Sequence, residues 1–488
     1  MDTQLDTTTR PQVEVDIERH LVGLGHLIDG EVVSDGQRFD VIAPWNGRVL
    51  ARCPAAEAEL LEKAVRSARR SQQSWAADSE ARRSALANIA DRLDEHADDL
   101  GTVNSAETGK PLHIGVGEIR GAAEHARWYA RQSLRVDTLE DSDAELTQVI
   151  REPVGVVAAI VPWNGPILML INKIAASIAT GNTVIAKSSP FTPLTSLLVG
   201  ALLRDLVPAG TVNILAGGDV LGKAMTAHPD VNMVAFTGSV DAGRDIMAAG
   251  APTLKRMLLE LGGNDAAVVL SDADLETAIP KLYRGAFALS GQICAAIKRL
   301  YVHESIFDDV VEGMAALALA AKAGTPWEDG VTMGPLTTKP QFDRVCSLME
   351  DALQNGGRAV TGGKALDKEG FFIPPTIITG VDHGVRLVDE EQFGPVLPIM
   401  SYRNLDEVME RANATEFGLG GSIWTADVQE GLRLAGRLRT GGAWVNRHPL
   451  VGASIPFGGA KQSGLGREGG QIGLDAFCEL KTVSVLFS

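Results

Sequence analysis

The chain has 488 residues, 45% of them hydrophobic and 22% charged, which is typical of a globular protein with two or three domains. Its 45 Lys and Arg residues against 62 Asp and Glu residues give a net charge of −17. This acidic balance argues against binding to nucleic acid or to an anionic membrane surface, because both require clustered basic side chains.

The sequence also lacks targeting and metal-binding signals. No apolar run reaches the roughly 18–20 residues of a membrane helix, and the polar N-terminal tail has no signal-peptide core. The cysteines are widely spaced without a CxxC pair, which predicts a reducing compartment and no metal site; they are Cys53, Cys294, Cys346 and Cys478. We therefore expect a cytoplasmic protein without membrane or nucleic-acid partners.

Helices come first along the chain. Residues 56–100 are predicted to be helical, because Leu60, Leu61 and later apolar residues recur at helical spacing. Between about 154 and 270, short β-branched runs alternate with apolar helical stretches such as 167–179 and 194–207. The runs are 154–161, 183–187, 211–215, 231–236 and 265–270. This alternation predicts an α/β fold with a mostly parallel, doubly wound sheet, whose ligands bind at the C-terminal ends of the strands.

The rest of the chain divides into a second α/β region and two unusual segments. The region spans about 262–465, with strands near 298–303 and 396–402. The segment 133–152 is polar and alternating, and 482–487 resembles a strand, yet neither fits a nucleotide-binding sheet. The sequence shows no internal repeat and no linker long enough to separate two independently mobile domains.

Cys294 is a candidate nucleophile. It lies in GQICAAIKR, after the helical run YRGAFALS. A lone cysteine is most often a small buried hydrophobe, but Gly291 and Gln292 allow a tight approach that leaves the thiol accessible. The thiol would still need a lowered pKa or a nearby base to react as a thiolate.

Glu260 is a candidate general base. It closes the apolar run LKRMLLE at a strand-to-loop transition and precedes Leu261 and two glycines. Most glutamates are ordinary solvated carboxylates. A desolvated carboxylate has a raised pKa instead and can accept a proton near neutral pH, so the role of Glu260 depends on its burial.

Two turns at strand ends are candidate binding sites. Gly238 and Ser239 follow the run 231–236 and lead through Gly243 into a helix, whose N–H groups could bind a pyrophosphate. The pattern is not GxGxxG and equally predicts a structural turn. Asn164, in PWNGP after another strand, is either a turn residue or an amide donor to a developing oxyanion.

Together these segments resemble the aldehyde dehydrogenase superfamily from about residue 27 to the C-terminus. The shared motifs are PWNGP at 162–166, FTGSVDAG at 236–243, ELGGND at 260–265, GQIC at 291–294, EEQFGPV at 390–396 and PFGGAKQSGLGRE at 456–468. Motifs this specific rarely occur in one order by chance. The run GQICAAIKRLYVHES is further similar to bacterial members of broad or unassigned substrate range.

The resemblance implies a Rossmann-type cofactor domain, an α/β catalytic domain and a β arm for oligomerisation. The implied cofactor domain comprises residues 1–132 and 153–261, the catalytic domain 262–465, and the arm 133–152 with 466–488. An arm of this kind extends the sheet of a neighbouring subunit. The resemblance therefore implies a homodimer or a homotetramer.

The resemblance also implies a reaction. Cys294 would attack the aldehyde carbon, while Asn164 and the Cys294 N–H hold the oxyanion. Hydride transfer to the nicotinamide would convert the thiohemiacetal to a thioester, and water activated by Glu260 would hydrolyse this to a carboxylic acid. Lys173 matches a lysine implicated in proton relay. Retention of Glu260 argues against acyl transfer to coenzyme A.

Cofactor residues follow from the same resemblance. They are Trp163, Lys187, Pro190, Gly238, Ser239, Gly243, Leu261, Gly262, Glu391 and Phe393. Glu391 would bind the nicotinamide ribose and Lys187 the adenosine ribose. Pro190 departs from the family pattern, because it replaces a glutamate that grips the ribose and repels a 2′-phosphate. We therefore expect NAD as the cofactor, with NADP tolerated.

The residues expected to line the substrate tunnel are apolar and mostly aliphatic. They are Gly165, Met169, Ala288, Ile293, Leu450, Val451 and Phe457. No arginine for a carboxylate-bearing semialdehyde is apparent, and no aromatic cage for a quaternary ammonium. We expect a small-molecule substrate that is an apolar aliphatic or aromatic aldehyde. The alternatives are a semialdehyde dehydrogenase of a catabolic pathway and a non-catalytic oligomer on the same fold.

Overall fold

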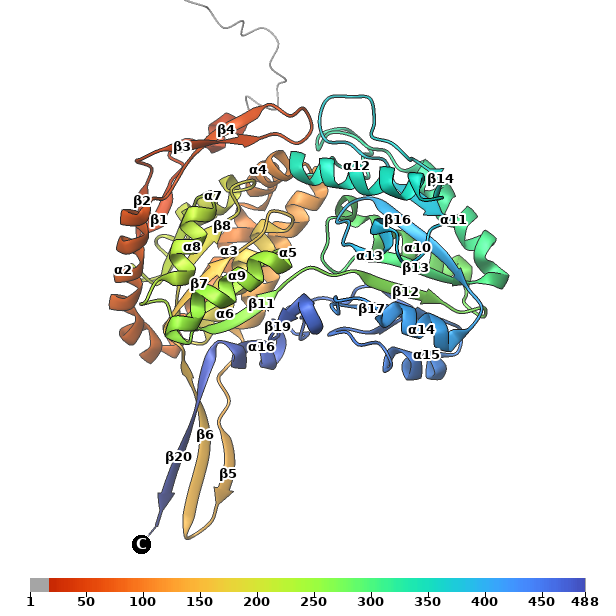
Figure 1. The fold of residues 1–488 in the computed structure, drawn as a ribbon. Helices are drawn as coiled ribbons and strands as arrows, with labels where there is room; N and C mark the ends of the chain where they lie inside the picture. Colours follow the sequence, from red (N-terminus) through yellow and green to blue (C-terminus); the bar gives the residue numbers. More distant parts are fainter. Residues whose placement is uncertain (1–16, 488) are drawn as a thin grey trace, which may run out of the picture.

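The computed structural model describes residues 17–487, so most of the predicted N-terminal tail lies outside the described residues. Figure 1 shows two α/β units side by side, with a long, narrow arm extending from the first. Within the described part of the chain, no helix is long and apolar enough to cross a membrane. Across the same residues, no group of three or more His, Cys, Asp or Glu side chains is placed to hold a metal ion.

The first unit is built on an eight-stranded sheet with the order β19-β11-β10-β7-β8-β9-β1-β2. Its central strands from β11 to β9 run parallel, whereas β1, β2 and β19 pair antiparallel at the two edges. This confirms the predicted doubly wound sheet. The strands are β1 His26–Ile28, β2 Glu31–Val33, β7 Val156–Ile160, β8 Thr183–Ser188, β9 Val212–Ala216, β10 Met233–Thr237, β11 Arg256–Glu260 and β19 Gly464–Leu465.

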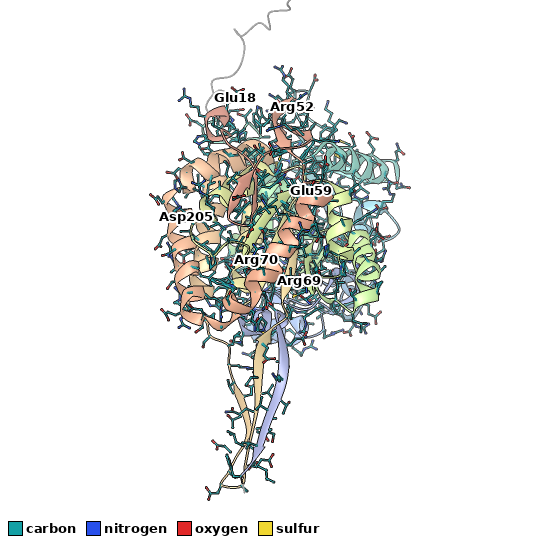
Figure 2. The ribbon with its side chains drawn as sticks, turned by 90° about the vertical axis from the view of Figure 1, so that its left-hand side faces the viewer. Glu18, Arg52, Glu59, Arg69, Arg70 and Asp205 are labelled. Atoms are coloured by element: carbon teal, nitrogen blue, oxygen red, sulfur yellow. The ribbon has the colours of Figure 1, made fainter. Side chains whose placement is uncertain are left out.

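Helices cover both faces of this sheet, and each face has its own apolar core. One core joins the sheet to α2, α8 and α9, and the other joins it to α3 through α7. Figure 2 shows Glu59, Arg69 and Arg70 of α2 pointing away from the sheet, because only one stripe of this helix is apolar. The helices are α2 Ala58–Ala77, α3 Ser79–Glu95, α4 Ala97–Thr108, α5 Leu112–Ala130, α6 Pro166–Ala179, α7 Leu194–Leu203, α8 Asp219–Ala227 and α9 Val240–Gly250.

The second unit contains a seven-stranded sheet with the order β14-β15-β16-β13-β12-β17-β18. The strands are β12 Asp265–Val269, β13 Ile297–His303, β14 Arg358–Thr361, β15 Thr376–Thr379, β16 Val396–Tyr402, β17 Gly421–Trp424 and β18 Trp444–Val445. Its helices are α10 Leu275–Phe287, α11 Phe307–Ala320, α12 Lys339–Gln354, α13 Arg386–Asp389, α14 Leu405–Asn413 and α15 Val428–Ala435. The strands predicted near 298–303 and 396–402 are confirmed as β13 and β16.

One predicted strand belongs to a different sheet from its neighbours in sequence. The run 265–270 was expected both as the last strand of the alternation that began at 154 and within the second α/β region from about 262; it forms β12, which pairs with β13 and β17 of the second sheet. The chain crosses between the sheets in the short loop after β11. Because β11 and β12 are both short strands of five residues that pair parallel with a neighbour, periodicity alone cannot assign them to separate sheets.

The arm is a three-stranded sheet with the order β20-β6-β5. It consists of β5 Asp137–Asp141, β6 Glu145–Pro153 and β20 Cys478–Leu486, and β20 pairs with β6 along its whole length. The two unusual sequence segments therefore lie side by side (Figure 1). Residues just before β20, expected in the arm, instead form helix α16 Gly470–Ala476, whose Leu474 packs into the core of the first unit. A separate hairpin joins β3 Arg38–Ile42 to β4 Val49–Pro54.

Candidate active site

A cavity of about 910 Å³ is lined by residues from both units. Most of the predicted catalytic and tunnel residues meet there, although they come from segments far apart in the sequence. The predicted residues that line the cavity are Cys294, Glu260, Asn164, Gly165, Met169, Ala288, Ile293, Val451 and Phe457. Apolar surface dominates the lining, so the polar side chains among these residues lie in a largely desolvated space.

The segment before Cys294 is held in an unusual backbone conformation. Leu289, Ser290 and Gly291 have φ angles of 52°, 57° and 70°, so three consecutive residues adopt left-handed geometry. Non-glycine residues in this region are strained unless their surroundings impose it. Here the surroundings do so: Ser290 Oγ donates to Gly334 O at 2.8 Å. A Cβ on Gly291 would overlap the backbone of Gly394, which explains the glycine in GQIC.

The Cys294 thiol is half-buried and faces mixed charges. Burial raises the pKa of the thiol to about 12; Lys298 lowers it, whereas the carboxylates of Glu391, Glu260 and Asp265 raise it further. A thiol in this setting is protonated at neutral pH. Any increase in its reactivity must therefore come from cationic charge or from a base close to it.

Glu260 ends β11 and is 4% exposed. Neither of its carboxylate oxygens has a hydrogen-bond partner among the described residues. Burial raises the pKa of Glu260 well above its ordinary value and Glu468 raises it further, while Lys173 and Arg467 oppose the shift. A Cβ on Gly458 would overlap Glu260 Oε1, so the glycine of the PFGG motif makes room for this carboxylate. The site thus holds a buried carboxylate that is free to accept a proton.

Glu468 joins the site without having been predicted in it. It lines the cavity, forms an ion pair with Lys173, and accepts a hydrogen bond from Asn172 Nδ2 at 3.0 Å. Lys173 itself is fully buried behind this carboxylate and does not line the cavity. Glu468 is the last residue of the motif at 456–468, and this motif was the only sequence feature that pointed to it. Its hydrogen-bond and ion-pair partners lie about 295 residues earlier, so their contact could not be predicted.

Asn164 is fixed by a buried ion pair that the sequence did not reveal. Its side-chain Nδ2 donates to Gln292 O at 2.9 Å, which brings the amide beside the nucleophile loop. Its backbone carbonyl accepts from Lys110 Nζ at 3.2 Å. Lys110 pairs with Glu118, whose Oε1 accepts the Ile167 N–H at 2.8 Å at the start of α6. The amide therefore lies at the cavity on a rigid support.

The glycine turn after β10 leads directly into helix α9. Ser239 is the N-cap of that helix, and its Oγ accepts the Ala242 N–H at 3.3 Å. Gly243 lies against Leu261, because a Cβ on it would approach Leu261 Cδ1 to 2.7 Å. The hydroxyl Oγ1 of Thr237, just before the turn, is buried without a partner in the described chain. An unpartnered hydroxyl beside a helix N-terminus fits a phosphate-bearing ligand.

The remaining predicted cofactor residues fall into two groups. Lys187 and Pro190 lie at the end of β8, where burial lowers the pKa of Lys187 to about 8 against the opposing effect of Asp219. Trp163 and Phe393 meet edge to face with ring centroids 5.4 Å apart. Gly262 gives room to Glu391, because a Cβ on it would overlap Glu391 Oε2. The residues of both groups fit a dinucleotide, with a cationic side chain for one end and a carboxylate for the other.

The lining of the cavity differs from the expected tunnel in three respects. Leu450 is not among the residues that line the cavity, although its neighbours Pro449 and Val451 are. An arginine is present: Arg284 of α10 lines the cavity, is exposed, and has no ion pair among residues 17–487. Aromatic side chains also line it in greater number than expected, namely Tyr283, Phe287 and Phe457.

Comparisons with known proteins agree with this geometry. The sequence model of the Aldehyde dehydrogenase family matches residues 32–483. The Bacillus subtilis protein DhaS, provisionally named an aldehyde dehydrogenase, is 39% identical over 485 residues, which cover 97% of this chain and 98% of DhaS. Human Aldehyde dehydrogenase 1A1 is 37% identical over 463 residues, 93% of this chain and 92% of the human protein.

Solved structures match over the same extent. The structure of an aldehyde dehydrogenase from Bacillus cereus in complex with NAD+ superposes with a TM-score of 0.93 at 35% identity. The match covers 99% of this chain and all of the Bacillus cereus chain. The likeness therefore includes both units and the arm.

Proposed function

Because the chain belongs to the aldehyde dehydrogenase family and so oxidises aldehydes to carboxylic acids with NAD(P), we propose that Cys294 and Glu260 carry that chemistry here. The observation that carries the proposal is the carboxylate of Glu260: it is buried, it lacks a hydrogen-bond partner within the described residues, and it lines the same cavity as Cys294. Burial of a carboxylate without a hydrogen-bond partner costs desolvation free energy. A catalytic role explains why such a group lines the same cavity as a thiol.

The proposed roles follow from the contacts. The Cys294 thiol first loses its proton to solvent. Its thiolate Sγ then attacks the aldehyde carbon, the C=O electron pair moves to the oxygen, and the Asn164 amide with the Cys294 N–H stabilises this negative oxygen of the thiohemiacetal. NAD(P), when bound, would supply the hydride acceptor, and loss of hydride from this carbon would leave a thioester on Cys294. Glu260 takes a proton from the water that attacks the thioester, so that the carboxylic acid leaves and the thiol is restored. Glu468 and Lys173 lie behind Glu260 and are the proposed outlet for that proton.

We propose apolar aliphatic or aromatic aldehydes as substrates, because the cavity is large and mostly apolar. A second candidate is a carboxylate-bearing semialdehyde, which Arg284, without an ion pair among residues 17–487, favours. The test is a panel of aldehydes assayed with NAD by NADH absorbance. We expect benzaldehyde-like and medium-chain aldehydes to exceed semialdehydes in kcat/KM by at least about tenfold, the effect of roughly 1.4 kcal/mol. The opposite order would establish the second candidate, and inertness with every aldehyde would favour a non-catalytic oligomer.

We propose NAD as the preferred cofactor, with NADP accepted, on the basis of Pro190. No carboxylate stands at this position to repel a 2′-phosphate. Pro190→Glu should therefore shift selectivity toward NAD, mainly by weakening NADP, and by roughly tenfold or more. The measurement is the ratio of kcat/KM for NAD to that for NADP, with the exposed Phe191→Ala as a neighbouring control. An unchanged ratio in Pro190→Glu would mean that another residue determines cofactor choice.

We also propose that copies of this chain self-associate through the arm in the cytoplasm. Strand β20 is an outer strand of the arm sheet, so its second edge is open for pairing. Several large apolar side chains on it are exposed, namely Leu480, Val483, Val485 and Leu486. Burial of such side chains against a second copy favours a dimer or a tetramer. The mass in sedimentation velocity measures the state.

A further inference from the structure

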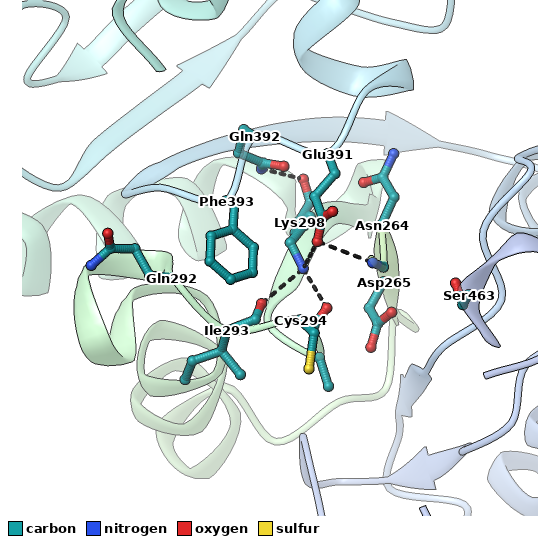
Figure 3. A network of polar contacts seen from close by, with 12 residues as sticks. Asn264, Asp265, Gln292, Ile293, Cys294, Lys298, Glu391, Gln392, Phe393 and Ser463 are labelled. Atoms are coloured by element: carbon teal, nitrogen blue, oxygen red, sulfur yellow. Dashed lines mark hydrogen bonds and ion pairs between the residues drawn. The ribbon is translucent and has the colours of Figure 1, made fainter. Parts of the chain in front are cut away.

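Lys298 is a fully buried cation at the beginning of β13, four residues after the nucleophile. Its side chain is 2% exposed. Its ammonium group donates to Ile293 O at 2.9 Å and to Cys294 O at 2.5 Å, and it lies 3.4 Å from Glu391 Oε1 (Figure 3). A lysine has three N–H donors and no acceptor, so these three oxygens use its whole capacity.

The three acceptors of Lys298 belong to separate parts of the site. Two of them are carbonyls of the nucleophile loop. The third, Glu391 Oε1, also accepts the Gly263 N–H at 3.0 Å, in the loop that follows Glu260 (Figure 3). One ammonium group therefore links the thiol-bearing loop to the carboxylate proposed for the cofactor and, through it, to the loop that follows the proposed base.

Lys298 provides the positive charge near the Cys294 thiol. Of the groups described as acting on Cys294, Lys298 is positive, and Glu391, Glu260 and Asp265 carry carboxyls. His448, which lies 3.6 Å from Asp265, has its pKa lowered to about 3 by burial and contributes no positive charge at neutral pH. Without Lys298, none of these groups would offer positive charge to the thiolate in a space of low dielectric.

We propose that Lys298 is a positioning residue that orients the nucleophile loop through its N–H groups and makes Cys294 reactive through its charge. The proposal rests on the assignment of Cys294 as the nucleophile. It concerns the protein without nucleotide, because every contact named lies within the chain. It also assigns a role to the lysine in GQICAAIKR that neither the tunnel nor the cofactor residues account for.

The test is the rate of alkylation of Cys294 by iodoacetamide, a neutral probe, between pH 6 and 10 without nucleotide. A Cys346→Ser background removes the other half-buried thiol. Lys298→Met should shift the pH profile upward by at least about one unit, so that alkylation at pH 8 slows by about tenfold or more. Lys298→Gln, which keeps N–H donors but no charge, should do the same, whereas Lys298→Arg should stay close to the parent.

The matched control is Lys255→Met. Lys255 is also buried and also donates to two backbone carbonyls, those of His228 and Val231 at 2.6 Å and 2.7 Å, but it lies at the opposite end of β11 from Glu260. Its loss should lower stability without moving the alkylation profile. If Lys298 were only a structural support, Lys298→Met would behave in the same way, and that result would overturn the proposal.

A further variant keeps the test decisive if Lys298→Met and Lys298→Gln fail to fold. The double variant Lys298→Met with Glu391→Gln removes both members of the ion pair and so leaves no partner uncompensated. Its profile should lie at least about one pH unit above that of Glu391→Gln alone, and equal profiles for these two variants overturn the proposal. Peptide mapping separates this result from failure of the proposed function. If alkylated Cys294 still supports aldehyde oxidation, the nucleophile assignment is wrong, whereas an unmoved profile with full inactivation contradicts only the role of Lys298.

Discussion

Replacing Cys294 by alanine is expected to lower kcat for aldehyde oxidation by about 10⁴-fold or more, which amounts to loss of activity. The thiol is the only protein group in the proposed mechanism that forms a bond to substrate carbon, so no neighbouring residue of that mechanism can substitute for it. The dissociation constant for NAD should stay within about twofold, because the proposed nucleotide contacts come from Lys187, the turn at Gly238 and Glu391. Stopped assays for the acid and a fluorescence titration with NAD measure the two quantities.

Cys346→Ala is the control for this experiment. Cys346 is likewise a half-buried thiol, but it lies on α12 and does not line the cavity. Its loss should leave kcat unchanged. Substantial oxidation by pure Cys294→Ala would mean that another nucleophile, or a direct reaction of the hydrated aldehyde, carries the chemistry.

Glu260→Gln is expected to slow steady-state turnover by about 10²- to 10⁴-fold while a pre-steady-state burst of NADH remains. The amide has nearly the shape of the carboxylate, so the cavity is preserved, but it cannot accept a proton from water. The thioester therefore accumulates after one hydride transfer. Rapid-mixing absorbance measures the burst, and Glu59→Gln on the exposed face of α2 is the control. A steady-state rate equal to that of the wild type would exclude Glu260 as the base.

The same residue predicts the direction of the pH dependence. Because burial and Glu468 raise the pKa of Glu260, the carboxyl is protonated below that pKa and cannot act as a base. Deacylation in the wild type should therefore rise with pH through the raised pKa and level off above it. Glu260→Gln should lose this rise. A rise of the same size in the variant would assign the titration to another group.

Local patterns predicted much of the fold. The runs at 154–161 and 183–187 contain the fully buried parallel strands β7 and β8, and such strands are recognisable because both of their faces are apolar. The run at 265–270 was predicted as a strand, but its pattern fits the end of the first alternation and the start of the second region equally, since pairing is a long-range property. Helix α16 was missed for a related reason: it is short, and Leu474 owes its burial to contact with the first unit.

The site shows a similar division. Cys294 and Glu260 were predicted from their motifs, whereas Glu468, Lys110 and Lys298 matter through partners that are distant in sequence or through burial that no local pattern reveals. Arg284 was overlooked because α10 has several faces, and the sequence does not show which one meets the cavity.

The short strand β19 has a consequence for engineering hybrid enzymes. It returns from beyond the second unit to pair with β11, and Leu261 N donates to Ser463 O at 2.9 Å beside it. A graft that exchanges only residues up to 261 would leave β11 facing a foreign strand, and a mismatched sheet edge promotes aggregation. Crossover points in chimeras should therefore lie in pairs, one near 261 and one before 463. The part of the chain that can be exchanged as a unit is therefore discontinuous. Segment 463–486 has to be exchanged together with the first unit.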